Sequence, residues 1–234
     1  MARHRGKGND TMRSDPSGWP GALRPTRRTL VRTAAWTAPV LATVAAAPAF
    51  AASPCQAQTI DFSSYATATA YPNGATFTAG LVTATLNLSG DTGAAGNGTI
   101  YATTSSTKEL RFYDLNSART SQTIRFTFNQ PVTNLSIRIL DIDQSSNYED
   151  FVLVNTPGYT YVAGASVDGD GRKKNSQFHS ATGSAVADGS GLADVTLSYA
   201  SATQFSITYS QGDGTITGNP HIGIRSMSFT PSTC

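Results

Sequence analysis

Residues 122–142 read QTIRFTFNQPVTNLSIRILDI, and their hydrophobic pattern indicates the fold class. Within it Ile124, Phe126 and Phe128 alternate with polar residues. Successive side chains of a β-strand point to opposite faces, so this segment has one apolar face and one polar face. The pattern predicts a strand with one buried face over 122–128. The turn residues Asn129–Pro131 predict a break, and a second strand is expected over 134–142.

The same two-residue period recurs on both sides of this stretch, whereas no sustained helical period is present. The further predicted strands are Thr76–Leu88, Thr99–Ala102, Glu109–Tyr113, Phe151–Val154, Tyr159–Val162, Ala193–Tyr199, Gln204–Tyr209 and His221–Phe229. Short strands separated by turn residues are typical of two packed antiparallel sheets. We therefore predict an all-β domain over 52–234, an antiparallel jelly-roll-like β-sandwich of about 8–10 strands. A β-barrel is the alternative.

The first 51 residues have the order of an export signal. Arg27 and Arg28 precede a short apolar run over 33–47, which ends in the small residues Ala49 and Ala51. This order predicts a signal peptide cleaved after Ala51. The paired arginines and the weakly apolar run resemble a twin-arginine signal, with a general secretory signal as the alternative. The run is too short for a membrane span, which takes about 20 apolar residues.

The charge is divided unevenly along the chain. The leader holds eight of the seventeen Lys and Arg residues but two of the fifteen Asp and Glu residues. The predicted domain therefore carries nine cations against thirteen carboxylates, a formal charge of −4. A negative domain does not suit nucleic acid or an anionic membrane as a partner, and we predict neither.

The two cysteines bracket the predicted domain. Cys55 follows the predicted cleavage site closely, and Cys234 lies at the other end of the domain. A metal site would need further cysteines or histidines at short spacing, but His179 and His221 are distant from both cysteines in sequence. In an oxidising compartment we predict a Cys55–Cys234 disulfide, which brings the first and last strands together. Free thiols are the alternative.

Part of the sequence resembles a pattern found in exported bacterial cell-surface β-sandwich modules. There, a strand, a Pro-Val turn, a second strand ending in Asp-x-Asp and a third strand beginning with Asp follow one another, as in Thr127–Asp143 and Asp150–Val154. The segment Ile222–Phe229 is similar to the last strand of such modules. With the leader, the whole resembles an exported protein of high-GC Gram-positive bacteria. The resemblance implies an extracellular, non-catalytic module.

The densest polar segment lies between two predicted strands and contains Asp141, Asp143 and Asp150. Carboxylates on one short segment repel one another unless a cation lies among them, and calcium takes six to eight oxygen ligands. The spacing does not match an EF-hand. We predict calcium at Asp141, Asp143 and Asp150. The alternative is a solvated acidic loop, or one paired with Arg138 or Arg225.

No Gly-x-Ser-x-Gly or His-Glu-x-x-His motif occurs in the sequence. We therefore predict a secreted, non-catalytic β-sandwich with a binding or structural role at the cell surface, whose partner is a glycan, a cell-wall polymer or a protein. Tyr71, Tyr148 and Tyr159 lie near predicted turns and are candidates for exposed sugar-stacking rings. The alternative is a secreted hydrolase that uses carboxylates or His221. A histidine within hydrogen-bond reach of a carboxylate in a cleft would favour the enzyme.

Overall fold

The computed structural model describes residues 55–103, 107–113, 120–212 and 220–234. They belong to one compact unit, Ser53–Cys234. The predicted signal peptide, with Arg27, Arg28 and the cleavage site at Ala51, lies outside the described residues. In the part that the structure describes, no helix is long and apolar enough to cross a membrane.

The described residues form strands and one turn of 3-10 helix, η1 (Phe62–Ser64). In chain order the strands are β1 (Gln58–Asp61), β2 (Thr76–Ala79), β3 (Val82–Gly90), β4 (Thr99–Ala102), β5 (Lys108–Tyr113), β6 (Ser121–Leu140), β7 (Gln144–Ser145), β8 (Tyr148–Val154), β9 (Tyr159–Ala163), β10 (Val167–Asp168), β11 (His179–Ser180), β12 (Val195–Gln211) and β13 (His221–Pro231). The predicted strand Thr76–Leu88 is two strands, because the chain reverses between β2 and β3 at Gly80, whose φ is +57°.

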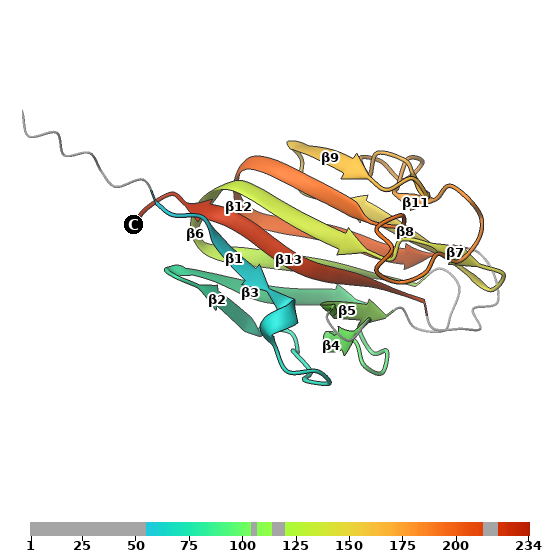
Figure 1. Ribbon diagram of the computed structural model, residues 1–234, viewed down its shortest axis with the longest axis horizontal. Helices are drawn as coiled ribbons and strands as arrows, with labels where there is room; N and C mark the ends of the chain where they lie inside the picture. Colours follow the sequence, from blue (N-terminus) through green and yellow to red (C-terminus); the bar gives the residue numbers. More distant parts are fainter. Residues whose placement is uncertain (1–54, 104–106, 114–119, 213–219) are drawn as a thin grey trace, which may run out of the picture. The chain divides into compact units, whose positions relative to one another are not determined.

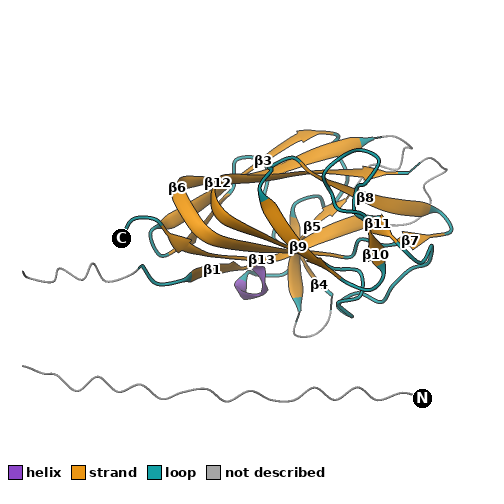
Figure 2. Cartoon of the chain, turned by 90° about the horizontal axis from the view of Figure 1, so that it is seen from above, coloured by secondary structure: helices purple, strands orange, loops and turns teal. Residues whose placement is uncertain are grey.

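Eleven of these strands form one continuous antiparallel sheet, and β10 pairs with β11 separately. The prediction of an all-β antiparallel sandwich is confirmed (Figure 1). Pairing divides the sheet into two layers that share the long strands β6 and β12, which lie side by side in Figure 2. One layer contains β2, β3 and β8 beside one half of each long strand. The other contains β1, β4, β5, β9 and β13 beside the other halves.

The predicted break at Asn129–Pro131 is wrong, because β6 continues through it. The partner strand β12 is likewise continuous where a break between two predicted strands was expected. The register between them shifts, so that Gln204 pairs with Thr127 but Ala202 pairs with Val132. Such a bulge bends a strand and leaves residues outside the ladder, where the missing N–H of proline costs nothing. The turn residues therefore mark the bend by which β6 passes from one layer to the other.

The core lies between the layers and follows the alternation seen in the sequence. Ile124 and Phe126 are fully buried and Phe128 is 5% exposed, whereas Arg125 and Thr127 between them are exposed. Phe126 also joins an aromatic group with Phe62 and Phe77, whose ring centroids are 5.0 Å apart. Each buried aromatic or aliphatic side chain stabilises the fold by about 1.5–3 kcal/mol, so this alternating face holds the two layers together.

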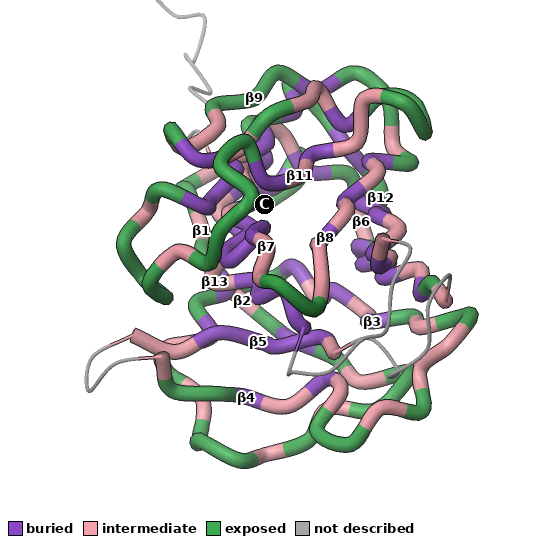
Figure 3. Tube along the Cα trace, turned by 90° about the vertical axis from the view of Figure 1, so that its right-hand side faces the viewer, coloured by how far each residue is buried: buried purple, intermediate pink, exposed green. Residues whose placement is uncertain are grey.

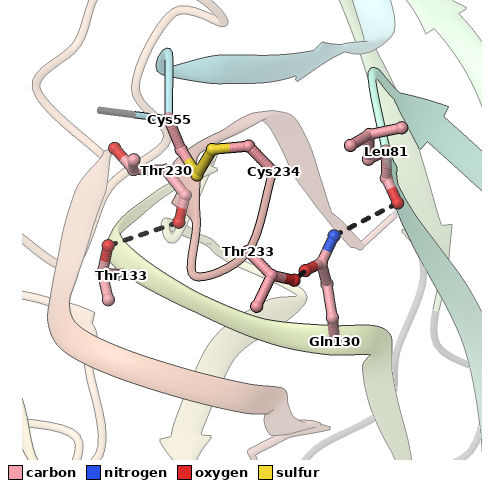
Figure 4. The surroundings of a disulfide bond; sticks show 7 residues. All are labelled: Cys55, Leu81, Gln130, Thr133, Thr230, Thr233 and Cys234. Carbon is pink, nitrogen blue, oxygen red and sulfur yellow. Dashed lines mark hydrogen bonds between the residues drawn. A yellow bond between two sulfur atoms is a disulfide. The ribbon is translucent and has the colours of Figure 1, made fainter. Parts of the chain in front are cut away.

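The predicted Cys55–Cys234 disulfide is confirmed, with the two Cα atoms 5.7 Å apart. It joins the ends of β1 and β13, which pair in the sheet. Beside it, Thr233 donates a hydrogen bond to Gln130 at the bend of β6, and the Gln130 amide reaches the carbonyl of Leu81 (Figure 4). One end of the sandwich is therefore fastened covalently and by hydrogen bonds.

The other end of the sandwich lies about 35 Å away, because β13 has eleven residues at about 3.3 Å each. Here β13 begins at His221 and β6 ends at Leu140. Figure 3 faces this end, with β7 and β8 between β11 and β5. The charged residues considered next all lie on the strands and loops of this end.

Candidate functional site

Seven charged or titratable residues gather at this end, and we call them the polar cluster. Its members are Glu109, Arg111, Asp141, Asp143, Asp150, Asp188 and His221. They meet because β13 pairs with both β5 and β6, which sets Gly223 opposite Arg111 on one side and Leu140 on the other. All except Asp188 are less than a tenth exposed. Burial of so many charges is costly and is not needed to hold a sandwich together.

Asp141 and His221 are paired in the polar cluster, with 2.9 Å between Asp141 Oδ2 and His221 Nε2, and the contact is an ion pair when the imidazole is protonated. Both side chains are almost buried, at 8% and 10% exposure. β6 ends at Leu140, and Asp141 has a φ of +65°. The strand alternation therefore stops before Asp141, and the left-handed backbone turns its carboxylate toward the start of β13. Asp and Asn tolerate this conformation better than most residues.

Arg111 forms ion pairs with two carboxylates through different nitrogens of its guanidinium. Its Nε donates to Glu109 Oε1 at 2.7 Å, and a terminal nitrogen donates to Asp188 Oδ2 at 3.2 Å. The guanidinium carbon also lies over the ring of Tyr101, 3.7 Å from its centroid, and 5.9 Å from the centroid of the Tyr113 ring. Stacking and ion pairing together hold the buried cation in one orientation.

Glu109 is fully buried, and only one of its two carboxylate oxygens is paired. Among the described residues, Oε2 has no hydrogen-bond partner. It lies against the backbone of Gly223, where a Cβ would stand 2.5 Å from it. Burial raises the pKa of Glu109, although the adjacent Arg111 opposes the rise. An unpaired buried carboxylate oxygen is unfavourable unless a proton or a cation reaches it.

Asp143 and Asp150 are also buried and have hydrogen-bond partners within the protein, although Asp143 Oδ1 has none among the described residues. Asp150 Oδ1 accepts hydrogen bonds from the Tyr209 hydroxyl at 2.7 Å and from Gln211 Nε2 at 2.6 Å. Asp143 Oδ2 accepts from the backbone of Val186 at 2.8 Å. Burial is the main cause that raises the pKa of Asp143, and it raises the pKa of Asp150 well above its usual value. Asp150 thereby connects β8 to β12, and Asp143 connects the segment after β6 to the loop before β12.

The structure divides the predicted calcium ligands. Asp143 and Asp150 are joined, because Asp150 Oδ2 accepts from the Asp143 backbone at 3.4 Å. Asp141 instead faces His221. Among the described residues, ligand atoms of Asp141, Asp188 and His221 lie within 4.8 Å of one another, which is the one group of three that could hold a metal ion. Arg138, a predicted partner of the acidic loop, binds Asp194 at 2.6 Å.

Sequence reasoning did not place Glu109, Arg111 or Asp188 in a site. The pattern around Glu109 and Arg111 predicts polar positions of a strand. Asp188 belongs to Asp188–Gly191, a segment typical of a turn. Local patterns contain no sign that these residues meet. His221 was singled out only for the hydrolase alternative, and its pairing with Asp141 satisfies one condition of that alternative.

The exposed aromatic rings differ from those predicted. Tyr159 is 4% exposed and packs against Tyr199, so its proposed role as an exposed ring is wrong. Tyr101 and Tyr161 are the exposed tyrosines of the described residues, at 45% and 38%. Tyr101 pairs with Glu109 in the sheet and stacks on Arg111, so an exposed ring borders the polar cluster.

The polar cluster thus combines carboxylates, a guanidinium, an imidazole and an exposed ring, which suit hydrogen bonding to a polar ligand, cation binding or proton transfer. Comparison with family models, with curated protein sequences and with solved structures finds no match. What this end of the molecule does therefore has to be argued from its geometry.

Proposed function

We propose that this chain is an exported, non-catalytic β-sandwich module that binds a glycan or cell-wall polymer outside the cytoplasm, through the end that carries the polar cluster. The observation that carries the proposal is the exposed Tyr101 ring beside a buried group of charges. Sugars are bound by a flat ring under their apolar face, with charged or polar groups directed at their hydroxyls. Few polar groups in fixed positions are enough to orient such a ligand.

The stacking arrangement gives this surface a fixed shape. The Arg111 side chain pairs with both Glu109 and Asp188, while its guanidinium lies over the Tyr101 ring. The Asp188 side chain is 39% exposed and the Tyr101 residue 45% exposed, so a ligand can reach both. A preorganised surface loses less side-chain entropy when a ligand binds.

Export is supported by two features. The sequence has the order of a signal peptide, with Arg27 and Arg28 before a short apolar run. The domain contains a disulfide, and disulfides persist mainly in oxidising compartments. The protein recovered from the culture medium is expected to begin at Ala52, and a different mature end would contradict cleavage after Ala51.

A glycan and cell-wall polymer screen tests the binding proposal. The wild-type protein is expected to retain at least one polymer, and Tyr101→Ala and Asp188→Asn are each expected to weaken retention at least tenfold. Tyr161→Ala is the matched control, because Tyr161 is also an exposed tyrosine but lies on β9, outside the polar cluster. No retention by the wild type, or equal loss in the control, would refute the proposal.

The second candidate is a hydrolase, and the Asp141–His221 pair favours it. A carboxylate that orients a histidine is the arrangement of a general base. The residues that would act are almost buried, so a substrate would have to displace part of the surrounding loops. A panel of glycosidic, ester and peptide substrates tests this candidate: turnover lost in His221→Gln and kept in His179→Gln would establish it, and no turnover would exclude these substrate classes.

A further inference from the structure

The polar cluster has more negative charge than its cations balance. It contains five carboxyl groups, whereas its cations are Arg111 and, when protonated, His221. Arg111 is already shared between Glu109 and Asp188. Charges repel strongly where water is excluded, so the excess has to be met by bound protons or by a cation.

Ligand-type atoms converge at one place in this cluster. Atoms of Asp141, Asp188 and His221 lie within 4.8 Å of one another. They come from three separate parts of the chain: the residue after β6, the loop before β12 and the first residue of β13. Asp141 and His221 are held by the ends of long strands, whereas Asp188 is exposed. Tetrahedral metal bonds of about 2.0–2.1 Å set ligand atoms about 3.3 Å apart. Asp141 Oδ2 and His221 Nε2 are already 2.9 Å apart, so a metal would replace the hydrogen between them and draw the Asp188 carboxylate closer.

A second, independent observation points to the same place. Glu109 is 0% exposed, and its Oε2 has no hydrogen-bond partner among the described residues. Both Asp141 and His221 are close enough to act electrostatically on this carboxylate. Gly223 permits the arrangement, because a Cβ there would stand 2.4 Å from Glu109 Cδ. The protein thus buries a carboxyl oxygen that has no hydrogen-bond partner within electrostatic range of Asp141 and His221, and a nearby cation would stabilise its charged form.

We propose that Asp141, Asp188 and His221 bind a divalent transition-metal cation of the zinc type, with Glu109 as the adjacent buried carboxylate. An imidazole nitrogen beside carboxylate oxygens is a donor set that suits zinc, whereas calcium and magnesium take oxygen donors. A doubly charged cation would balance Asp141 and Asp188, and it would leave Arg111 to balance Glu109. The site does not depend on glycan binding, and the two can fail separately.

The test is a titration of the full chain, freed of any affinity tag and of metal by a chelator, with zinc chloride and in parallel with calcium chloride. Calorimetry is expected to show one zinc per chain, and zinc is expected to raise the midpoint of thermal unfolding because it binds only the folded form. Zinc is expected to bind at least tenfold more tightly than calcium.

Two variants assign the ligands. Asp188→Asn changes an exposed side chain and is expected to fold normally, as circular dichroism would verify, while its zinc affinity falls at least tenfold. His221→Gln is expected to do the same. His179→Gln is the matched control, since His179 also pairs with a carboxylate, Glu149 at 3.4 Å, outside the polar cluster. The control is expected to keep wild-type affinity.

Three results would overturn the site. These are no zinc binding by the wild type, an equal loss in the His179→Gln control, or unchanged affinity in a folded Asp188→Asn variant. A calcium response that survives in Asp188→Asn but is lost when Asp143 or Asp150 is replaced by asparagine would instead support calcium at the ligands predicted from the sequence. Glycan retention that persists without zinc would leave the binding proposal standing by itself.

Discussion

At the scale of single residues, the buried carboxyl groups determine how stability depends on pH. Burial raises the pKa of Asp143 and Glu109 and raises the pKa of Asp150 most clearly. The unfolded chain exposes these groups, where their pKa is about 4. The folded protein therefore holds their protons more tightly. This contribution to stability is complete below about pH 4 and is lost as the pH rises through the folded-state pKa values.

The metal-free protein is accordingly expected to become more stable as the pH is lowered from 7 toward about 4.5. Asp150→Asn keeps the volume and the acceptor for Tyr209 but cannot ionise, so its free energy of unfolding should vary less over this range. Urea denaturation at a series of pH values in a chelating buffer measures both curves. The exposed Asp168→Asn variant is the control and should run parallel to the wild type. An Asp150→Asn curve that is also parallel would contradict the argument.

At the scale of elements, the bend of β6 fastens the β2–β3 hairpin. Asn129 Oδ1 accepts from the Thr83 backbone at 2.9 Å, and Asn129 Nδ2 donates to the Leu81 carbonyl at 3.2 Å. Gln130 Nε2 donates to the same carbonyl at 3.3 Å. Backbone groups of the β2–β3 hairpin lose their β6 backbone partners at the bulge. The Asn129 side chain supplies hydrogen bonds to them instead.

Asn129→Ala is expected to lower the free energy of unfolding by about 1 kcal/mol, because two bonds are lost at a position where water can replace them. Asn129→Asp keeps the acceptor for Thr83 and loses the donor to Leu81, so its loss should be partial. Chemical denaturation measures all three proteins under the same conditions. A variant series with no graded loss would show that the bend is held by packing and not by these bonds.

At the scale of the whole molecule, the disulfide closes the sandwich at the end opposite the polar cluster. It spans a sequence separation of 179 residues. In the chain-entropy model a loop of this length stabilises the folded state by roughly 5 kcal/mol, and measured values are often smaller. The paired strands β1 and β13 hold the same ends together without it.

Reduction is expected to raise the mass by two hydrogens and to lower the melting temperature while the sheet remains folded. A domain of this size buries a sizeable core, so it does not depend on one covalent link. Mass spectrometry and circular dichroism, before and after reduction, measure the two effects. An unchanged mass would contradict the disulfide, and complete unfolding at room temperature would contradict the estimate of its contribution. A Cys55→Ser, Cys234→Ser variant should match the reduced protein.

The class of fold, the buried faces of the strands and the disulfide were all predictable from local sequence patterns. Alternation over 122–128 was enough to place Ile124, Phe126 and Phe128 in the core, because the period of a strand is local and is read from neighbouring residues. The pairing of Cys55 with Cys234 was equally accessible, since two cysteines in one domain leave one intramolecular partner for each.

The continuation of β6 through Pro131 and the existence of the polar cluster depend on contacts between distant parts of the chain, so no local pattern predicts them. A proline after polar residues predicts a turn. The bulge that lets β6 continue is visible only in its register with β12, and register depends on residues that are distant in sequence. Arg111 and Asp188 are likewise far apart in sequence, and each has an ordinary local pattern. They meet because β13 lies between β5 and β6, which places the start of β13, the end of β6 and the loop before β12 at one end of the sandwich.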